Sequence, residues 1–372
     1  MVRRSRDPTL LLAAVALPPP VHGQSVINSA VLSHLVDREE IQTVAIDIGP
    51  RKYRSTLGYH LNRVSGVLRA IAEQFRHAYH PKRVLYTVIE SGWGRCYNVA
   101  IIAVSRILRF QIVLHHHTSA HTLNHSKWFA FLSHLAGRDT MHVVLSDQMA
   151  SDLRRTYPSV TQTLVVHNSA FIALSPDLSK VGSQIPDLRI GFLSNLANEK
   201  GLDRVIDVLR SGRAEGLTLT LKLGGPATSA KVAEQIKSAQ AEFGPALEVL
   251  GAVGPLEKNK FFLGIDVFLF LSRYRFEAQP LVVLEAMSHG VPTIVSQCGY
   301  TPEIVGDAGH ILFDQSAVVA ESVSICRQYV GGSFSLSSQG SKSRARFVEL
   351  HSEAQSGLRL LREWVINGGR AT

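Results

Sequence analysis

The chain has 372 residues, of which 45% are hydrophobic and 19% are charged. This composition is typical of a globular protein and excludes an intrinsically disordered chain. Because one hydrophobic core rarely serves so long a chain, two domains of ordinary size are expected.

The formal net charge of +9 lies almost entirely in the first half of the chain. Residues 1–187 carry 20 lysines and arginines against 12 acids, whereas residues 188–372 carry 19 against 18. Such a bias suits an anionic substrate or an anionic membrane surface, and a solvated basic face without a partner fits it equally. Basic and aromatic residues do not interleave as in nucleic-acid recognition motifs, so nucleic acid is not an expected partner.

The amino-terminal segment has two interpretations. Its arginines precede an apolar run at residues 10–17, as in a secretory signal peptide. No A-x-A cleavage site follows, and prolines at residues 18–20 lead into a loop with a glycine, which favours a first buried strand. The cysteines are odd in number, far apart and not in C-x-x-C pairs, as in a reduced cytoplasmic protein; they are Cys96, Cys298 and Cys326.

Short apolar runs alternate with amphipathic segments along the whole first half, with a helical pattern at residues 59–79 as the clearest example. Continuous apolar strands separated by helices indicate parallel strands covered on both faces. No run reaches the roughly 20 residues that a membrane span needs. The strands expected here are residues 9–17, 42–47, 83–90, 111–116, 142–147 and 163–168.

The same alternation restarts at residue 188, so two Rossmann-like doubly wound domains are expected, at residues 1–178 and 179–372. They are joined near residues 171–187, and an amphipathic helix at about 345–365 could pack back on the first domain. Ligands of such sheets bind at the carboxyl ends of the strands, which predicts a site in the cleft between the domains. The second set of strands is residues 188–194, 217–225, 247–253, 266–272, 292–298 and 310–313.

The most informative segment is "SRYRFEAQPLVVLEAMSHGVPTIVS", residues 272–296. Pro280 is expected at the first position of a helix, which places Glu277 and Glu285 near the amino end of that helix. Carboxylates there could accept hydrogen bonds from sugar hydroxyls, although two surface acids on an ordinary helix have the same spacing. The first free helical N–H groups would attract a phosphate; they belong to Leu281 and Val282.

This segment resembles the E-x7-E signature of retaining glycosyltransferases with the GT-B fold, family 4, also called glycosyl transferases group 1. The resemblance continues through "GYTPEIVGDAGHILF", with Glu303 and Gly309, and through "GFLSNLANEKGLDRVIDVL" and "LKLGGP". In the first half, "PPPVHGQS" and "VVHNSA" are similar to loops of the same family. The resemblance to this family implies that the first domain binds the acceptor and the second domain binds a nucleotide-sugar.

The resemblance also implies roles for single residues. Glu285 would hold the ribose of the nucleotide, Glu277 would contact hydroxyls of the transferred sugar, and Lys200 would neutralise the donor diphosphate. Asn195 stands where the family often has a basic residue, usually arginine. Leaving-group charge would then fall more heavily on Lys200 and on the amides at residues 281 and 282.

The family chemistry needs no metal and no cofactor beyond the nucleotide-sugar. Departure of the diphosphate creates negative charge, which preorganised cations and amides stabilise directly. The resemblance implies retention of configuration by front-face attack, in which the departing phosphate accepts the proton of the acceptor. The metal-dependent glycosyltransferase fold typically uses D-x-D, and no two aspartates in this chain are two residues apart.

Five of the 16 histidines lie in "IVLHHHTSAHTLNHS", residues 112–126. If the segment were helical, His117, His121 and His125 would share a face and could bind zinc. No acid occurs between residues 90 and 139, and "TS" at residues 118–119 favours a loop or a cap, so a metal is not expected. Histidines without any role are a further interpretation.

The resemblance favours a substrate role for one of these histidines. "HHTS" is similar to the family's histidine loop that faces the donor sugar, and the matching residue is His117. His115 would share its face if the strand alternation persists. Gly23, with His22, would lie in the first loop on the other side of the same pocket.

The sequence therefore predicts a hexosyltransferase-type enzyme of polysaccharide biosynthesis that acts on a glycan or lipid-linked glycan. The basic first half suggests peripheral contact with an anionic membrane at its cytoplasmic face. Two alternatives are a nucleotide-sugar epimerase of similar architecture and a catalytically silent sugar-binding protein, which Asn195 keeps open.

Overall fold

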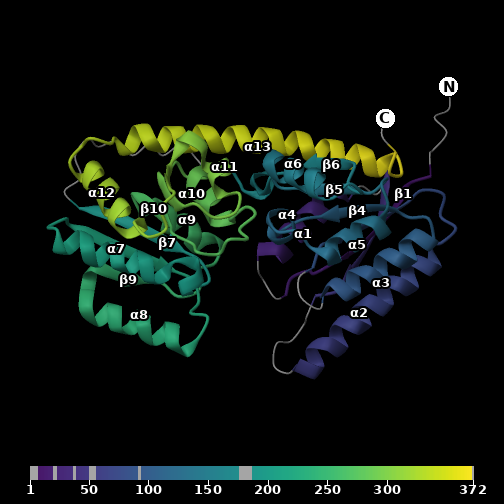
Figure 1. Cartoon of the computed structure of the whole chain (residues 1–372), viewed down its shortest axis with the longest axis horizontal. Helices are drawn as coiled ribbons and strands as arrows, with labels where there is room; N and C mark the ends of the chain where they lie inside the picture. Colours follow the sequence, from purple (N-terminus) through teal and green to yellow (C-terminus); the bar gives the residue numbers. More distant parts are fainter. Residues whose placement is uncertain are drawn as a thin grey trace. The chain divides into compact units, whose positions relative to one another are not determined.

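The computed structural model of the chain describes residues 7–19, 23–36, 39–49, 56–90, 94–175 and 187–370 (Figure 1). It divides into two compact units. Unit 1 comprises Met1–Phe171 and Ser352–Thr372, and unit 2 comprises Ile172–His351. The predicted boundary at residues 178 and 179 lies outside the described residues, as does His22. Within the described ranges, no helix has the length and apolar character needed to cross a membrane.

Unit 1 contains a six-stranded parallel sheet in the order β2-β1-β3-β4-β5-β6. All seven residues of β1 are buried, and β1 pairs with β2 on one side and β3 on the other. The apolar amino-terminal run is therefore a buried strand, as predicted, and it lies inside the sheet. The strands are β1 (Thr9–Val15), β2 (Ile41–Asp47), β3 (Arg83–Val88), β4 (Gln111–His115), β5 (Met141–Val144) and β6 (Gln162–Val165).

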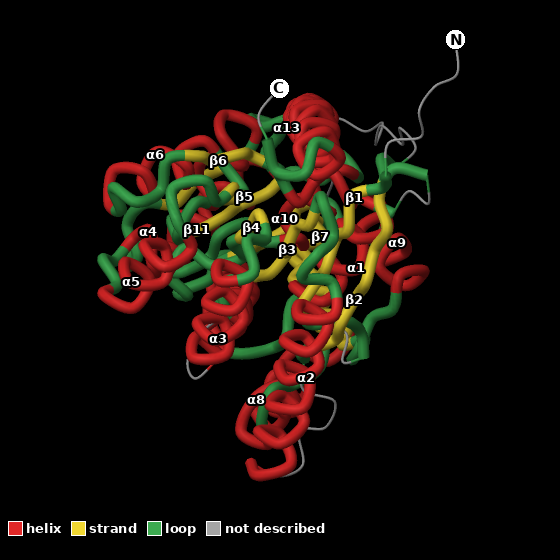
Figure 2. Tube along the Cα trace, turned by 90° about the vertical axis from the view of Figure 1, so that its right-hand side faces the viewer, coloured by secondary structure: helices red, strands yellow, loops and turns green. Residues whose placement is uncertain are grey.

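Helices connect successive strands of this sheet, and α2 and α3 lie side by side (Figures 1 and 2). Ser126 and Ser146 cap α5 and α6 by accepting hydrogen bonds from backbone N–H groups three residues on. The helices are α1 (Gly23–Leu35), α2 (Thr56–Arg76), α3 (Gly94–Ile107), α4 (Ala120–Leu123), α5 (Lys127–Ala136), α6 (Asp147–Thr156) and the 3-10 helix η1 (Asn168–Phe171).

Unit 2 repeats this architecture with a parallel sheet in the order β12-β11-β10-β7-β8-β9. Every strand predicted from the apolar runs is present in one of the two sheets. The strands of unit 2 are β7 (Leu188–Leu193), β8 (Leu219–Gly224), β9 (Leu247–Val249), β10 (Val267–Phe270), β11 (Thr293–Ser296) and β12 (His310–Leu312).

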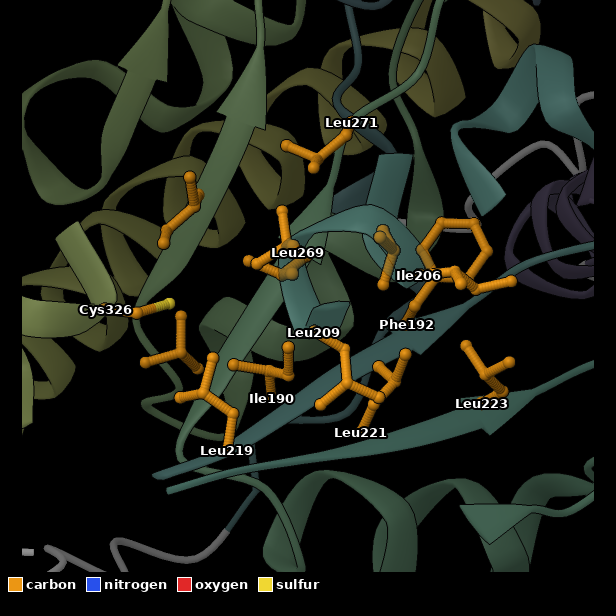
Figure 3. Close-up of a cluster of buried hydrophobic side chains, with 14 of the residues drawn as sticks. Ile190, Phe192, Ile206, Leu209, Leu219, Leu221, Leu223, Leu269, Leu271 and Cys326 are labelled. Carbon is orange, nitrogen blue, oxygen red and sulfur yellow. The ribbon is translucent and has the colours of Figure 1, made fainter. Parts of the chain in front are cut away.

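The core of unit 2 joins the sheet to its helices. Figure 3 shows Phe192 of β7 and Leu221 of β8 packed with Ile206 and Leu209 of α7, all of them buried. The helices of this unit are η2 (Asn198–Lys200), α7 (Leu202–Ala214), α8 (Ala230–Phe243), η3 (Gly244–Ala246), α9 (Pro255–Leu263), α10 (Leu281–Ser288), α11 (Thr301–Val305), η4 (Gly306–Ala308) and α12 (Val318–Val330).

The last helix, α13 (Leu336–Ile366), begins nine residues before the predicted start near residue 345. Its final part belongs to unit 1. There the backbone carbonyl of Ile366 accepts a hydrogen bond from the Thr9 hydroxyl at 2.9 Å. Gly357 lies so close to β6 that a Cβ atom would be 2.2 Å from the Val165 carbonyl oxygen, so a glycine is required at this crossing.

Candidate functional site

The predicted glutamates of unit 2 lie where β10 meets α10. The chain leaves β10 at Phe270, passes Glu277 in a loop and enters α10 at Leu281. Pro280 is the N-cap, with φ −69° and ψ 117°, so its prediction as the first helical residue is wrong by one position. The extended ψ angle excludes Pro280 from the helix, while its carbonyl oxygen accepts the first intrahelical hydrogen bond, from the Val283 N–H.

The amino end of α10 presents free donors. Because the first helical hydrogen bond comes from the Val283 N–H, those of Leu281 and Val282 precede the bonded turns. The helix dipole adds partial positive charge at the same end. Both amides precede the bonded turns, and anion binding by them stays a prediction from the sequence.

Lys200 and Glu277 form an ion pair in unit 2, although 77 residues separate them in the sequence. The Lys200 ammonium also lies 4.6 Å from the centre of the Tyr274 ring. The hydroxyl of Ser272 donates to Glu277 Oε1 at 3.4 Å. The glutamate side chain is only 11% exposed, so it is not an ordinary surface acid.

Two glycines hold this pair in place. Gly201, directly after Lys200, has φ +93°, and a Cβ atom there would be 2.3 Å from the Leu271 carbonyl oxygen. Gly299 has φ +51°, and a Cβ atom there would be 1.7 Å from the carbonyl oxygen of Glu277. Only glycine permits both approaches. The loops after β7 and β11 are thereby fixed against the segment that follows β10.

Glu285 lies one turn inside α10, and its side chain is 17% exposed. Its Oε1 accepts from the Lys258 ammonium of α9 at 2.7 Å, whereas its Oε2 is buried without a partner among the described residues. Burial raises the pKa of Glu285, and Lys258 opposes that shift only in part. One carboxylate oxygen is therefore held by the protein, and the other is buried with no hydrogen-bond donor among the described residues.

Asn195 occupies the turn after β7, and its side chain is exposed. The neighbouring residue Leu196 forms an isolated parallel bridge with Ala227. In the glycine turn after β8, Gly225 has φ +120° and a Cβ atom there would be 1.7 Å from the Ser194 carbonyl oxygen. The turn that carries Asn195 is thus packed against the "LKLGGP" turn noted in the sequence.

In unit 1, His117 lies two residues after the end of β4 and contacts α1. Its Nε2 lies 3.1 Å from Oδ1 of Asn28. The Asn28 amide nitrogen donates to the Ala16 carbonyl oxygen at 3.0 Å, which fixes the orientation of the amide. Since Oδ1 can only accept, the His117 ring donates from Nε2, so that a neutral form of this ring would have its lone pair on Nδ1.

His115 lies on the same side of the chain as His117, as strand alternation predicts, with ring centres 4.2 Å apart. It is fully buried, and its Nδ1 lies 2.6 Å from the Tyr86 hydroxyl. Burial, together with His117, lowers the pKa of His115 well below its usual value. The ring is therefore neutral and forms one wall against which His117 packs.

The helix required for a three-histidine zinc site does not form. Only the four residues of α4 are helical, so His117 and His125 lie outside it. His121 turns inward to His116, while the ring of His125 stacks on Tyr157 at 5.5 Å. Among the described residues, no group of three or more histidine, cysteine, aspartate or glutamate side chains is placed to hold a metal.

Gly23, the remaining predicted residue, is exposed and begins α1, five residues before Asn28. Sequence reasoning missed Asn28, and it missed Lys258 and Tyr274 in unit 2. Each makes its contact through tertiary packing, at a sequence separation that follows no local pattern. The one available signal was the strand-loop-helix position of Asn28, near the start of the first helix.

The second unit has a clear match among known families. Residues 187–327 match the family described as Glycosyl transferases group 1. These residues form a glycosyl transferases group 1 domain. The domain contains Asn195, Lys200 and both predicted glutamates, and the resemblance noted in the sequence is confirmed at this level.

A curated relative and several solved structures are similar to the chain. The amylovoran biosynthesis glycosyltransferase AmsD of Erwinia amylovora is 28% identical over 130 residues, which are 34% of this chain and 35% of that protein. The match thus spans about a third of the relative.

The solved structures include HepE of Anabaena in complex with UDP-glucose, with a TM-score of 0.65 and 16% identity over 95% of this chain and 99% of that one. Sucrose-phosphate synthase of Thermosynechococcus elongatus has a TM-score of 0.67 and 16% identity, over 95% and 98%. At such identity they show the fold alone. The chain has the GT-B fold that these structures share, which confirms the predicted class.

Proposed function

We propose that the chain is a glycosyltransferase that moves a sugar from a nucleotide-sugar donor to a glycan or lipid-linked glycan. The observation that carries this proposal is the Lys200–Glu277 ion pair beside the amino end of α10, within the group 1 domain. We further propose family 4 chemistry: a hexosyl group is transferred with retention, and no metal takes part.

The ion pair would exchange partners when the donor binds. The diphosphate replaces Glu277 as the anion beside Lys200, and the amides of Leu281 and Val282 donate to its oxygens. Glu277 is then released to accept hydrogen bonds from hydroxyls of the sugar. One anion is exchanged for another, so the lysine charge stays compensated throughout.

The nucleoside would bind at Glu285. Its Oε2 lacks a partner among the described residues and can accept from a ribose hydroxyl, while Lys258 holds Oε1. Asn195 is proposed to face the same donor from the turn after β7. The carboxylate gains a hydrogen bond on binding, which offsets part of the free energy that its burial costs.

Cleavage of the sugar–phosphate bond places negative charge on the departing diphosphate and positive charge on the sugar ring. Lys200 and the two amides stabilise the first, at roughly 3 kcal/mol for a single preorganised donor. His117, through its Nδ1 lone pair, is proposed to stabilise the second. The acceptor hydroxyl attacks the sugar carbon and the departing phosphate accepts its proton, so no separate general base is needed.

The test compares Lys200→Ala and Glu277→Ala with Lys237→Ala, an exposed lysine of α8. Donor turnover should fall about 100-fold in the first two variants and stay unchanged in the third. Turnover that survives both substitutions would exclude this site. Product analysis without acceptor identifies an epimerase, and full activity after exhaustive chelation supports transfer without a metal.

We also propose peripheral contact with an anionic membrane at its cytoplasmic face through α2. This helix exposes an apolar stripe, in which Leu68 and Phe75 are 60% and 57% exposed, beside the exposed Arg69 and Arg76. Aromatic and aliphatic side chains can enter the interface while arginines meet anionic headgroups. The rest of the stripe is Leu61 and Val64, also exposed.

Vesicle sedimentation tests this contact with the double variant Leu68→Glu, Phe75→Glu. Its matched control is Leu256→Glu on α9, a leucine that is 81% exposed. Binding to phosphatidylglycerol vesicles should be lost in the double variant, persist in the control and fall as salt rises. Binding that is insensitive to salt, or to the double substitution, would contradict the proposal.

A further inference from the structure

A small pocket in unit 1 is lined by residues to which no role has been assigned so far. It lies between α3, α5 and the segments after β3 and β4, and its volume is about 60 Å³. At roughly 15 Å³ for each water-sized group, it holds about four such groups. That is room for the phosphorus and three oxygens of a phosphoryl group, but not for a hexose ring, so an attached chain would lie outside this volume.

Hydrogen bonds among three buried histidines determine which ring nitrogen of His121 is protonated. His116 Nδ1 lies 2.7 Å from His121 Nε2, and His116 Nε2 lies 3.0 Å from His142 Nδ1. All three rings are neutral, because burial lowers the pKa of His116 well below its usual value and those of His121 and His142 to about 3. Each ring therefore carries a single N–H, and the two hydrogen bonds must run in the same direction.

The direction of these two hydrogen bonds follows from His142, the histidine farthest from the pocket in this series. His142 Nε2 is buried without a partner in the described structure. A buried N–H without an acceptor is rarer and costlier than an unused lone pair, so the proton of His142 is on Nδ1. His142 then donates to His116, and His116 donates to His121. His121, which lines the pocket, is left with an N–H at Nδ1.

Arg95 adds a cation to the same pocket, and its charge acts on His121. The pocket also contains a carboxylate, Glu90, but this group is paired with the buried Arg63 at 3.1 Å. No carboxylate among the described residues pairs with Arg95. Two donors, one of them charged, thus meet in a pocket whose single acid is already neutralised.

Most of the remaining wall is apolar, and Thr118 and Ser126 are its polar residues. Val99, Phe129 and Leu132 line it, the last two buried, and Trp128 stands at the rim with 47% of its surface exposed. A ligand that matches both the donors and the apolar side of the pocket has a small anionic head and an apolar tail. Free sugars offer no such tail, and neutral lipids offer nothing to Arg95.

We infer that this pocket binds a phosphate ester with an apolar chain, as the carrier end of a lipid-linked acceptor. The phosphate accepts from the Arg95 guanidinium and from His121 Nδ1–H, and the chain leaves over Trp128. The role of this site rests on the proposed function, because the bound phosphate ester would belong to the acceptor of the sugar. Binding itself requires no sugar transfer.

Calorimetric titration of the full chain with geranyl phosphate tests the site. Saturable binding is expected, with about tenfold weaker affinity in Arg95→Gln, which loses one charge-assisted hydrogen bond. Arg95→Lys should retain part of the affinity. Arg138→Gln, an exposed arginine outside the pocket, should bind as the parent chain does, and matched thermal transitions show that each variant is folded.

Three comparison ligands separate the sources of affinity. Geraniol lacks the anion, inorganic phosphate lacks the chain, and glucuronic acid is an anionic sugar; each should bind far more weakly than geranyl phosphate. Equal binding to the parent chain and Arg95→Gln, or preference for glucuronic acid, would overturn the inference. Geranyl phosphate binding without any sugar transfer would refute the proposed function and leave the site intact. Efficient transfer to a lipid acceptor that is indifferent to Arg95→Gln would refute the site alone.

Discussion

At the scale of single residues, Asn28 determines the tautomer of His117. The side-chain amide of Asn28 cannot flip without breaking its 3.0 Å hydrogen bond to the Ala16 carbonyl oxygen. His117 must therefore donate from Nε2, at 3.1 Å, and its neutral form would have the ring lone pair on Nδ1. A sugar-facing role for this histidine thus depends on a residue that is buried and never meets the sugar.

Asn28→Leu should remove this control. Nitrogen NMR of the histidine rings is expected to show the Nε2–H tautomer of His117 in the parent chain and a mixture in the variant. Turnover should fall about tenfold with little change in KM, because one neutral hydrogen bond contributes roughly 1 kcal/mol. Ser33→Ala, on the exposed side of α1, is the control. An Nδ1–H tautomer in the parent chain would refute the assignment.

Glu285 illustrates a conflict between stability and binding. Burial raises its pKa above the unfolded value, so the folded chain disfavours the carboxylate. The stability contributed by its protonated form is complete below the unfolded pKa and is lost as pH rises through the folded pKa.

Glu285→Gln should therefore raise the Tm at pH 7, and the difference from the parent chain should vanish at pH 4 and below. The same variant should bind the nucleotide donor more weakly, since the amide cannot reproduce the charged acceptor that we assign to the ribose. Thermal unfolding at several pH values, with and without donor, measures both effects. A lower Tm at pH 7 would mean that the Lys258 ion pair outweighs the cost of burial.

At the scale of elements, the loop after β7 depends on a close approach that only glycine allows. Gly201 has φ +93°, and a Cβ atom added to it would lie 2.3 Å from the Leu271 carbonyl oxygen. Gly216 has a similar φ, +83°, but a Cβ atom added there would meet nothing within 4 Å. A comparison of alanine substitutions at these two positions therefore separates the free-energy cost of backbone strain from that of steric overlap.

Gly216→Ala should lower the free energy of unfolding by about 1 kcal/mol, from the left-handed conformation alone. Gly201→Ala should cost at least about 2 kcal/mol more, because backbone must move, and it should also displace Lys200. Denaturant unfolding of the two variants gives both numbers. Equal losses would show that the loop accommodates a side chain easily.

At the scale of the whole molecule, a donor that binds only the folded chain must stabilise it. A ligand present at 100 times its Kd adds about 2.7 kcal/mol. A panel of nucleotide-sugars should therefore raise the Tm selectively, and the responding compound identifies base and sugar. The shift should be absent in Lys200→Ala and preserved in Lys237→Ala. A uniform lack of response across the panel would argue against a nucleotide-sugar donor.

The sequence by itself determined the architecture of both units. Apolar runs of four to nine residues, separated by amphipathic helices, predicted the strands of both sheets, and the inner strands are apolar because both of their faces are buried. The proline and acids of the sequence also predict Glu277 and Glu285 near the amino end of one helix, and the family resemblance predicts Lys200 as a further site residue; the roles of all three stay predictions.

Only the tertiary structure decided which groups meet. The pairing of Lys200 with Glu277, of Glu285 with Lys258 and of His117 with Asn28 joins residues 27 to 89 positions apart. The sequence also left open the backbone conformation of the segment with the five histidines, because their spacing fits a helix as well as a loop. Local sequence fixes the backbone pattern, whereas side-chain partners depend on how sheets and helices pack, and no short-range pattern encodes that packing.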